Sequence, residues 1–519
     1  MIPKLRRRQA VHQADEALLA ALGYKQEFRR EFTPLEVFGI AFSIIGLVPS
    51  ISSVLFYAIP NGGGPAMVWG WLVASIFILL VGLSMAELAS AAPTSGGLYF
   101  WTYSLASKKW RNLLCWIVGY ANTIGSVGGI ASIDWGAAVQ VTAAVTIVYF
   151  RLAVIYLGLS TIHYSGIYTA IVISHAVACC LGTRVLARLQ TVYVALNILL
   201  SVALIIALPA ATPKEFKNSA KFALGDFTNL SGWPNGFAFV YSFLAPLWTI
   251  GSFDSSVHIS EEASNAAIAV PWVIVGAVSM GGILGCAINI SLAFCMGSDV
   301  QALADSAQPM AQILVNSFGR NATLGVWVLV VLFLAASRQT FAFSRDGALP
   351  FSNWLYRMNP HTKTPVNVVC FDGLLALALG LLIFAGQQAI NAIFSMSIVA
   401  TYIAYAIPII VRFTGGNNFQ PGPFTLGAFG LPIAITAVLF MFFIAIVFFF
   451  PGSPGVGSAD MNYSVVVVGG TLALSTLWYY FPKYGGVHWF KGPNLPDTSG
   501  PSEHSIDVKH SDSVEVHSK

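Results

Sequence analysis

The chain of 519 residues is 56% hydrophobic and 9% charged, with a formal net charge of +4. A soluble protein of this size has about a quarter of its residues charged, so the composition excludes a water-soluble globular fold. The Lys and Arg residues are scattered along the chain, which excludes the basic stripe of a nucleic-acid-binding protein. The composition therefore predicts an all-α membrane protein.

Twelve segments are predicted to cross the membrane, because a helix needs about 20 apolar residues to cross about 30 Å of hydrocarbon. They are approximately residues 35–57, 66–89, 113–147, 164–182, 189–210, 236–257, 271–296, 321–337, 365–385, 388–411, 431–450 and 463–482. The N-terminal segment, residues 1–34, lacks the short apolar core of a secretory signal. The tail, residues 483–519, is polar from Asn494 onward and is predicted to be disordered. The membrane domain is thus predicted to span residues 35–482.

The positions of the Lys and Arg residues predict that both termini are cytoplasmic. In that orientation 21 of the 26 basic residues lie in the terminal segments and the cytoplasmic loops, and five lie outside. Positive charge resists translocation, so this asymmetry orients the helices. Three Asn-x-Ser/Thr sequons, at Asn229, Asn321 and Asn462, fall in outside loops in this topology, and Asn229 is the one clear of the membrane.

Helix-breaking residues lie at the centre of the first and sixth segments. The first contains Gly46 and Pro49, and the sixth contains Pro246 and Gly251. Gly permits unusual backbone angles, and Pro removes a hydrogen-bond donor. Proline kinks are also common in membrane helices that bind nothing. The matched positions favour breaks that expose backbone groups to a solute at the middle of the membrane.

Segments one and six each begin a set of five, which is the arrangement of an inverted repeat. The pattern predicts a first repeat at about residues 35–210, a second at about 236–411, and two extra helices at about 431–482. N–H groups near Val48 to Ser50 would hold a carboxylate, as helix N-termini do for anions. Carbonyl groups around Ala245 to Thr249 would accept hydrogen bonds from an ammonium group, with Trp248 or Phe253 offering a cation–π face.

Four ionisable residues lie within or at the ends of the spans, where charge is costly and usually functional. Asp254 is expected to face the substrate amine, line the inner vestibule or titrate with a coupled proton, and the alternative is that it caps the inner half-helix. Asp134 is either a coupling residue or a packing residue, whereas His175 is more typical of a core histidine. Glu87 ends the second span on the cytoplasmic side, where gate or loop contacts are expected.

Motifs of soluble chemistry are missing from the sequence. It has no Walker loop, no paired Cys or His at metal spacing and no Gly-x-Ser-x-Gly elbow. An enzyme, a metal site and a cofactor are therefore not predicted. A channel would show a selectivity filter or rings of pore-lining charges, and none is apparent.

Several motifs resemble the amino acid–polyamine–organocation superfamily, in particular its fungal GABA-permease and choline-transporter branch. They are FSIIGLVPSISS (42–53), AELASAAPTSGGLYFW (86–101), GYANTIGSVGGIASIDWG (119–136), APLWTIGSFDSSVHISEEA (245–263), QPMAQI (308–313), AASRQTFAFSRDGALPFSNW (335–354) and KTPVN (363–367). The resemblance implies a LeuT-like five-plus-five inverted repeat with discontinuous helices 1 and 6, two extra C-terminal helices and alternating access.

In such families the break residues of the first and sixth spans bind substrate. The corresponding residues here are Ser43, Gly46, Leu47, Val48, Pro49, Ser50, Ala245, Pro246, Trp248, Thr249, Gly251, Phe253 and Asp254. Related carriers often place a lysine in the fifth span in the role of a sodium ion, and the approximate equivalent here is Asn197. The candidates for coupling or gating are Asp134, Asn197, Glu87, Arg338 and Arg345.

The eighth span departs from the family pattern. Its apolar run from Leu324 to Ala336 covers only about 20 Å as a helix. Either the helix continues through Ser337 to Phe343, or roughly half a span is missing from the sequence. A real deletion would put transport itself in doubt.

The sequence therefore predicts a secondary active transporter for a small amino-acid-like solute such as GABA, another amino acid or choline. Coupling to protons or exchange is expected. The alternatives are a carrier of polyamine or choline organocations, and a transport-impaired sensor. The expected partners are the solute, a coupled ion such as H⁺ and the lipid bilayer, without nucleic acid, in a monomer or weak oligomer. The plasma membrane is the expected location, with the vacuole or another endomembrane as alternatives.

Overall fold

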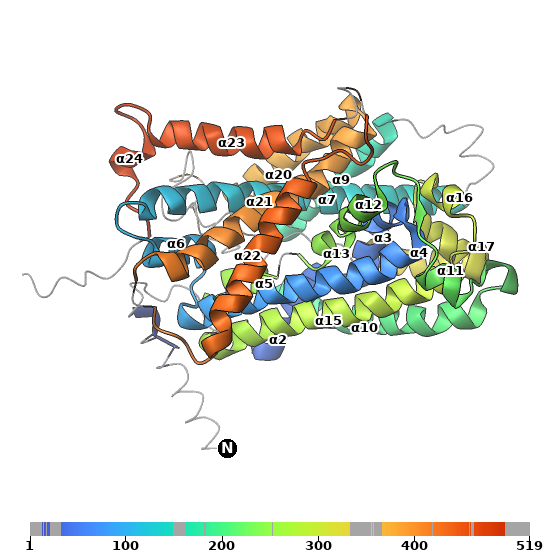
Figure 1. Cartoon of the computed structure of the whole chain (residues 1–519), viewed down its shortest axis with the longest axis horizontal. Coiled ribbons are helices and arrows are strands. Elements are labelled where there is room, and N and C mark those ends of the chain that lie inside the picture. The colour runs from blue at the N-terminus through green and yellow to red at the C-terminus, as the bar shows by residue number, and fades with distance from the viewer. Residues whose placement is uncertain are drawn as a thin grey trace, which may run out of the picture.

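The structure is a computed structural model that describes residues 33–148, 161–180, 183–251, 253–332, 366–417, 419–455, 457 and 461–493, with positions 13, 15, 16, 18–20, 354 and 357. The described chain is almost wholly helical (Figure 1). Its two short strands, β1 (Asn61–Gly62) and β2 (Thr228–Asn229), pair antiparallel. The prediction of an all-α membrane protein is confirmed at this level.

The helices of the first half, in chain order, are α2 (Pro34–Ile45), α3 (Leu47–Ala58), α4 (Gly63–Pro65), the π-helix η1 (Ala66–Gly70), α5 (Trp71–Ala91), α6 (Gly97–Leu105), α7 (Arg111–Val148), α9 (Thr161–Cys180), α10 (Thr183–Ala211), η2 (Lys214–Phe216) and α11 (Ala220–Leu224). Those of the second half are α12 (Asn235–Tyr241), α13 (Leu244–Thr249), α14 (Ser255–His258), η3 (Ser260–Glu262), α15 (Ala266–Cys295), α16 (Val300–Ala304), α17 (Pro309–Leu332), α20 (Val366–Gly380), η4 (Leu381–Ala385), α21 (Gln387–Thr414), η5 (Gly427–Phe429), α22 (Gly430–Val447), α23 (Ser464–Tyr479) and α24 (Gly486–Trp489).

Ten helices of the described chain are long and apolar enough to cross a membrane. They correspond to ten of the twelve predicted segments. The sixth segment is divided into the short helices α12, α13 and α14, and the twelfth forms α23, an apolar helix of 16 residues. These two segments are therefore shorter as continuous helices than the apolar pattern predicts.

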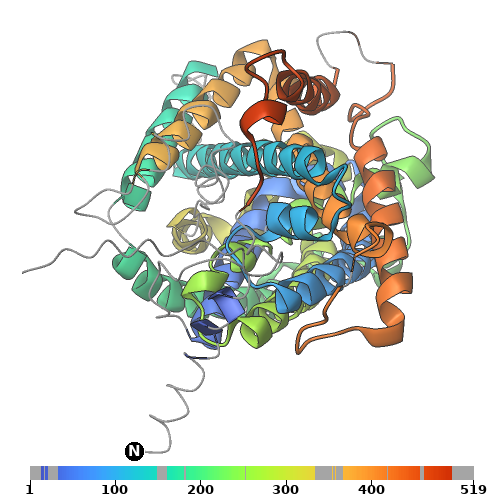
Figure 2. The ribbon, with the colours of Figure 1, turned by 90° about the vertical axis from the view of Figure 1, so that its left-hand side faces the viewer.

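The long helices run side by side in one bundle (Figure 1). The main packing pairs are α5 with α15 and α7 with α21, so helices far apart in sequence form the core. The end-on view in Figure 2 shows α3 inside the bundle and α22 and α23 at its edge. Eleven of the twelve residues of α3 are buried, as expected for a segment enclosed by other helices on all sides.

Small residues allow α7 and α21 to approach closely. A β-carbon on Gly125 would lie 2.5 Å from the Thr401 hydroxyl, and one on Gly128 would lie 2.7 Å from Met396. The Ser397 hydroxyl also donates a hydrogen bond to the Gly125 carbonyl oxygen at 2.9 Å. Small side chains at such crossings bring the two backbones together.

The helix that contains the eighth predicted span is interrupted at Gly319. This residue has φ 74° and ψ 173° inside α17, so the helix restarts at Arg320 and is described as far as Leu332. At about 1.5 Å per residue this part is about 20 Å long. The stretch from Ser337 to Phe343, on which the length of the eighth span depends, lies outside the described residues.

The glycine triplet Gly62 to Gly64 packs against the loop between α10 and α12. The strand pair joins Asn61 to Asn229, and a β-carbon on Gly64 would lie 2.4 Å from the Ala223 carbonyl oxygen. Gly62 and Gly63 both have positive φ, at 141° and 60°, which residues with a β-carbon rarely adopt. Main-chain contacts thus fix the loop to the start of the second span.

Candidate functional site

The first break is a single left-handed residue. Gly46 has φ 44° and ψ 59°, ends α2 by donating its N–H to the Phe42 carbonyl oxygen at 3.2 Å, and is followed directly by α3. A left-handed glycine is the usual end of a helix. Here the next helix starts at once, with Pro49 in its first turn, where a missing N–H costs nothing.

The first turn of α3 leaves backbone donors without intrahelical partners. The N–H of Ser50 already bonds the Gly46 carbonyl oxygen at 2.9 Å, and Pro49 has no N–H. The donors of this helix start are therefore those of Leu47 and Val48, which begin one residue before the Val48 to Ser50 stretch expected from the sequence. The Ser50 hydroxyl donates instead to the Ile45 carbonyl oxygen at 2.7 Å.

Gln140 of the neighbouring helix α7 forms hydrogen bonds with the same turn of α3. Its amide nitrogen lies 2.8 Å from the Pro49 carbonyl oxygen, 2.6 Å from the Ser52 hydroxyl and 2.8 Å from the Ser53 hydroxyl. Its backbone oxygen accepts a hydrogen bond from the Trp327 indole of α17 at 2.9 Å. This fully buried amide joins the first, third and eighth spans, and the sequence analysis did not identify it.

The second break has two interruptions. Pro246 is the third residue of α13, and its ring disturbs the preceding turn at Ser242 and Phe243. In this turn the N–H groups of Phe243 and Ala245 donate to carbonyl oxygens only three residues earlier, as in a 3₁₀ turn. The helix then continues through Thr249 and stops before Gly251. The carbonyl groups of the last turn of α13 are thus left without intrahelical donors, apart from that of Pro246, which accepts from the Ile250 N–H at 2.8 Å.

The two breaks meet at a small cavity of about 40 Å³. Helices α3 and α13 pack against each other, and α7 and α21 complete the walls. The lining residues are Ser50, Gly129, Ile133, Leu247, Trp248, Gly251, Ser397, Ile398, Thr401, Tyr402 and Tyr405. The walls are apolar and aromatic with a few hydroxyl groups, which is typical of small-molecule sites.

Three of the predicted binding residues line this cavity: Ser50, Trp248 and Gly251. The Trp248 indole donates to the Ser132 hydroxyl at 2.8 Å, and its ring centroid lies 5.0 Å from that of Phe394. The remaining predicted residues are not among the lining residues. They are Ser43, Gly46, Leu47, Val48, Pro49, Ala245, Pro246, Thr249, Phe253 and Asp254, and those with a described burial are buried.

Sequence reasoning missed the walls that come from α7 and α21. Ser397, Thr401, Tyr402 and Tyr405 recur at the spacing of one helix face, a signal in the sequence that could have indicated a polar stripe in an otherwise apolar span. The approach of Gly129 to the cavity depends on how α7 packs on α21, which no local pattern specifies.

Asp254 lies next to the cavity at the start of α14, but its side chain makes no capping hydrogen bond. It is 1% exposed, and its Oδ2 lies 3.5 Å from Nε2 of His258. Its carboxylate also interacts with the phenol of Tyr405, which lines the cavity. The alternative that Asp254 serves as a side-chain cap therefore has no support in the geometry.

Two other coupling candidates are buried away from the cavity lining. Asp134 of α7 pairs with His175 of α9, with 2.6 Å between Oδ1 and Nδ1. Asn197 of α10 is fully buried near Tyr193, whose hydroxyl would lie 3.2 Å from a β-carbon on Gly46. The fifth span thus reaches the first break through Tyr193.

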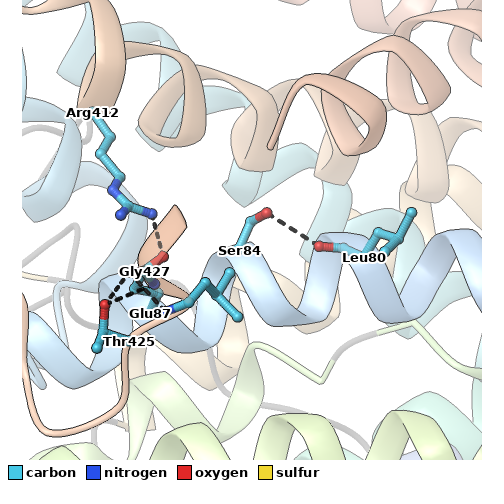
Figure 3. Close-up of polar contacts among 7 residues, drawn as sticks. Leu80, Ser84, Glu87, Arg412, Thr425 and Gly427 are labelled. Atoms are coloured by element: carbon cyan, nitrogen blue, oxygen red, sulfur yellow. Dashed lines mark hydrogen bonds and ion pairs between the residues drawn. The ribbon is translucent and has the colours of Figure 1, made fainter. Parts of the chain in front are cut away.

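Glu87 forms a latch with Arg412 near the end of α21 and with the loop that follows this helix (Figure 3). The side chain is 1% exposed and forms an ion pair with Arg412. Its Oε1 accepts hydrogen bonds from the Thr425 hydroxyl at 2.8 Å and the Leu426 N–H at 3.1 Å. The guanidinium of Arg412 lies over the ring of Phe419, 4.4 Å from its centroid. Glu87 therefore contacts a loop, one of the two roles that its sequence position indicates.

The other candidate residues lie elsewhere. Arg338 and Arg345 lie outside the described residues. Asn229 is partly exposed in β2, and its side-chain oxygen accepts from the Ser231 hydroxyl at 2.8 Å. Asn462 is 6% exposed, and its amide donates to the Phe448 carbonyl oxygen at 2.8 Å. Within the described segments, no group of three or more His, Cys, Asp or Glu side chains is arranged to hold a metal ion.

Comparisons with known proteins agree with this architecture. Residues 32–471 match the model of the amino acid permease family. A GABA-specific permease of Saccharomyces cerevisiae is 39% identical over 505 residues, which cover 93% of this chain and 86% of the relative. An uncharacterised amino-acid permease of Schizosaccharomyces pombe is 39% identical over 495 residues, covering 92% and 88%. Amino-acid permease 2 of Neurospora crassa is 33% identical over 492 residues, covering 93% and 89%.

These matches extend along nearly the whole chain, from the first broken helix to the last apolar helix. Together with the ten apolar helices, they indicate an integral membrane protein. The permease relatives indicate a transporter and not an enzyme. The chain belongs to the amino acid permease family, within the superfamily that its motifs resemble.

Proposed function

We propose that the chain is a secondary active transporter for a small amino-acid-like solute, with its binding site in the cavity between the breaks of α2–α3 and α12–α14. The observation that carries the proposal is that both breaks border one cavity near the middle of the bundle. Backbone groups freed by the two breaks have opposite character: N–H donors at the start of α3 and carbonyl acceptors at the end of α13.

The two helix ends suit a zwitterion. A carboxylate is stabilised at the N-terminus of α3 by the Leu47 and Val48 donors and the helix dipole. An ammonium group is stabilised by the carbonyl groups of the last turn of α13, with the ring of Trp248 at the cavity wall available for a cation–π contact. Opening of the first turn of α3 toward the cavity is part of the proposal, because Leu47 and Val48 do not line it in this conformation.

The size of the cavity favours a small solute. Its 40 Å³ accommodates a few water molecules. A short amino acid such as GABA needs only modest widening, achieved by movement of the half-helices, whereas a long polyamine needs much more. A relative named as a GABA-specific permease supports the same solute class.

We also propose that the twelve segments form a LeuT-like inverted repeat, with α2 to α10 as the first half, α12 to α21 as the second, and α22 and α23 as the extra helices. Both halves begin with a broken helix, which supports this division. We propose that both termini lie in the cytoplasm, which the distribution of basic residues supports. We further propose that the protein resides in the plasma membrane.

The test is radiolabelled uptake in a permease-deficient yeast that expresses the chain. GABA, choline, neutral amino acids and putrescine are compared with and without a proton gradient. We expect accumulation of GABA or another amino acid. Uptake of choline or putrescine alone would instead assign the organocation alternative. No accumulation of any solute, with protein present at the surface, would contradict transport and favour the sensor.

A further inference from the structure

We propose that Asp254 and His258 together form a site for one transported proton, and that His258 is the second coupling residue. The inference rests on the proposed function, because it names the coupled ion and its acceptors at the same site. The two side chains lie on one short inner element, α14 with its preceding residue, directly after the second break. Both are buried, with side-chain exposures of 1% for Asp254 and 8% for His258.

The hydrogen bond made by Nδ1 of the His258 ring fixes the tautomer of this side chain. Its Nδ1 lies 3.0 Å from the Ser95 carbonyl oxygen. A carbonyl oxygen only accepts, so Nδ1 carries the hydrogen in the neutral ring and Nε2 carries a lone pair. That lone pair faces Oδ2 of Asp254 at 3.5 Å. Two acceptors therefore face each other, and one added proton converts their repulsion into a charge-assisted hydrogen bond.

The pair is connected to the solute cavity by Tyr405. This phenol lines the cavity and interacts with the Asp254 carboxylate. On the other side, His258 contacts the turn before α6, where a β-carbon on Gly97 would lie 3.9 Å from Cε1 of His258. The backbone N–H and hydroxyl of Ser95 both donate to Oε1 of Glu261. The site thus lies between the cavity and the loop that joins α5 to α6.

Other titratable groups surround this pair on the described elements that pack against α14. They are Tyr405 on α21, Glu261 and Glu262 on η3, Tyr99 and Tyr103 on α6, and Glu36 on α2, while Cys286 and Cys295 lie on the half of α15 that is remote from α14. Of these, Glu36 lies at the exposed start of α2, and no Lys or Arg is among them.

The pair of Asp134 and His175 differs from this pair in which ring nitrogen faces the carboxylate. In the Asp134–His175 pair, Nδ1 of His175 lies 2.6 Å from the Asp134 carboxylate. A neutral ring with its hydrogen on Nδ1 already completes that hydrogen bond without an added proton. This pair is a control, because it joins α7 to α9 through a buried Asp134 and a partly exposed His175 and is not part of the cavity wall.

The proton transfer is balanced at each step. A proton from the outer solution enters with the solute and binds a carboxylate oxygen of Asp254, which becomes neutral. The O–H bond then breaks as a bond forms to Nε2 of His258, giving an imidazolium and restoring the carboxylate. After the inner side opens, the Nε2 proton passes to cytoplasmic water, and His258 returns to its neutral tautomer.

The experiment uses the full chain in proteoliposomes with an inwardly directed proton gradient, labelled GABA and an internal pH indicator. For one coupled proton, a gradient of about one pH unit supports about tenfold accumulation, since each tenfold in protons balances a tenfold in solute. We expect the wild type to approach this ratio and to acidify the lumen. His258→Gln should lose both gradient-driven accumulation and lumenal acidification, with a ratio of internal to external GABA near one. It should still exchange external for internal GABA.

His258→Asn is the second variant, and His175→Gln is the control that should keep gradient-driven accumulation. Accumulation and acidification by His258→Gln at the wild-type level would overturn the inference. Loss of exchange in His258→Gln, His258→Asn and His175→Gln alike would also overturn it, because it would indicate a general structural role. If the wild type carries no GABA in either mode, the proposed GABA transport fails first, which separates the two conclusions.

Discussion

At the scale of single residues, Gly46 shows how one backbone conformation positions a site. Its left-handed φ of 44° lets α2 end and α3 begin without a loop. The same residue faces the Tyr193 hydroxyl of the fifth span, so the break has little space for a side chain. Both the torsion angle and the neighbour exclude a branched residue here.

Gly46→Val is expected to abolish uptake while the protein still reaches the membrane. Left-handed backbone costs a residue with a β-carbon about 1–2 kcal/mol, so the break moves or straightens. Gly166→Val is the control, since a β-carbon at this exposed position of α9 meets nothing within 4 Å. Radiolabelled uptake and surface labelling are measured for both variants. Wild-type uptake by Gly46→Val would contradict the assigned role of the break.

Thr401→Val tests the wall contributed by α21. Thr401 lines the cavity, and valine keeps its shape while removing its hydroxyl group. A hydrogen bond contributes about 0.5–1.5 kcal/mol, so KM should rise about two- to tenfold with little change in maximal rate. Thr436→Val is the control, because its hydroxyl bonds the Pro432 carbonyl oxygen on α22, away from the cavity. An unchanged KM for Thr401→Val would remove α21 from the binding site.

At the scale of elements, the sixth span shows why a broken helix remains stable inside a bundle. Pro246 is tolerated because it occupies the first turn of α13, where the backbone N–H has no intrahelical partner. The interrupted segments are then held by packing of α13 on α3 and α21. Tertiary contacts thus compensate for hydrogen bonds that a continuous helix would make.

The latch between Glu87 and Arg412 should contribute strongly to the stability of the end of the bundle where α5 ends. Removing one member of a buried ion pair leaves an unpaired charge and costs about 3–5 kcal/mol. Glu87→Gln and Arg412→Met are each expected to lower the thermal unfolding temperature of the purified protein. The double variant should lose less than the sum of the two, because no unpaired charge remains.

Ser84→Ala is the control for the latch. Ser84 lies one turn before Glu87 on α5, and its hydroxyl bonds only the local Leu80 carbonyl oxygen among the contacts in Figure 3. It should leave the unfolding temperature nearly unchanged. Strictly additive losses in the Glu87 and Arg412 variants would show that the two side chains are not energetically coupled.

At the scale of the whole molecule, the proposed topology makes a prediction about glycosylation. Asn229 is partly exposed in the loop between α10 and α12, whereas Asn462 is buried and donates to the Phe448 carbonyl oxygen at the C-terminal end of α22. In yeast, Asn229→Gln should remove a mass shift that is sensitive to endoglycosidase, and Asn462→Gln should leave it. Because glycans are added only on the lumenal side, the shift also reports orientation. A shift retained in Asn229→Gln would contradict this assignment.

The sequence predicted the helical segments and the two breaks because both follow from local properties: apolar length, and Gly or Pro at the centre of a span. It did not predict Gln140, Ser397 or Thr401 as parts of the site region. Those assignments depend on which helices pack together, and α7 and α21 meet across more than 200 residues of chain. It bracketed the second break by Pro246 and Gly251, and the structure interrupts the span in the turn before Pro246 and again before Gly251.

The glycine triplet Gly62 to Gly64 has a consequence for how the protein tolerates variation. Gly64 lies against the Ala223 carbonyl oxygen, and the ring of Phe227 lies against Gly62. The Asn218 amide also bonds the Ala293 and Gly297 carbonyl oxygens. Loop side chains other than Phe227 and Asn218 can therefore change without loss of these contacts, while any residue larger than glycine at position 64 displaces the loop. Libraries that randomise those other side chains should remain functional, and libraries that randomise Gly62 to Gly64 should return glycine.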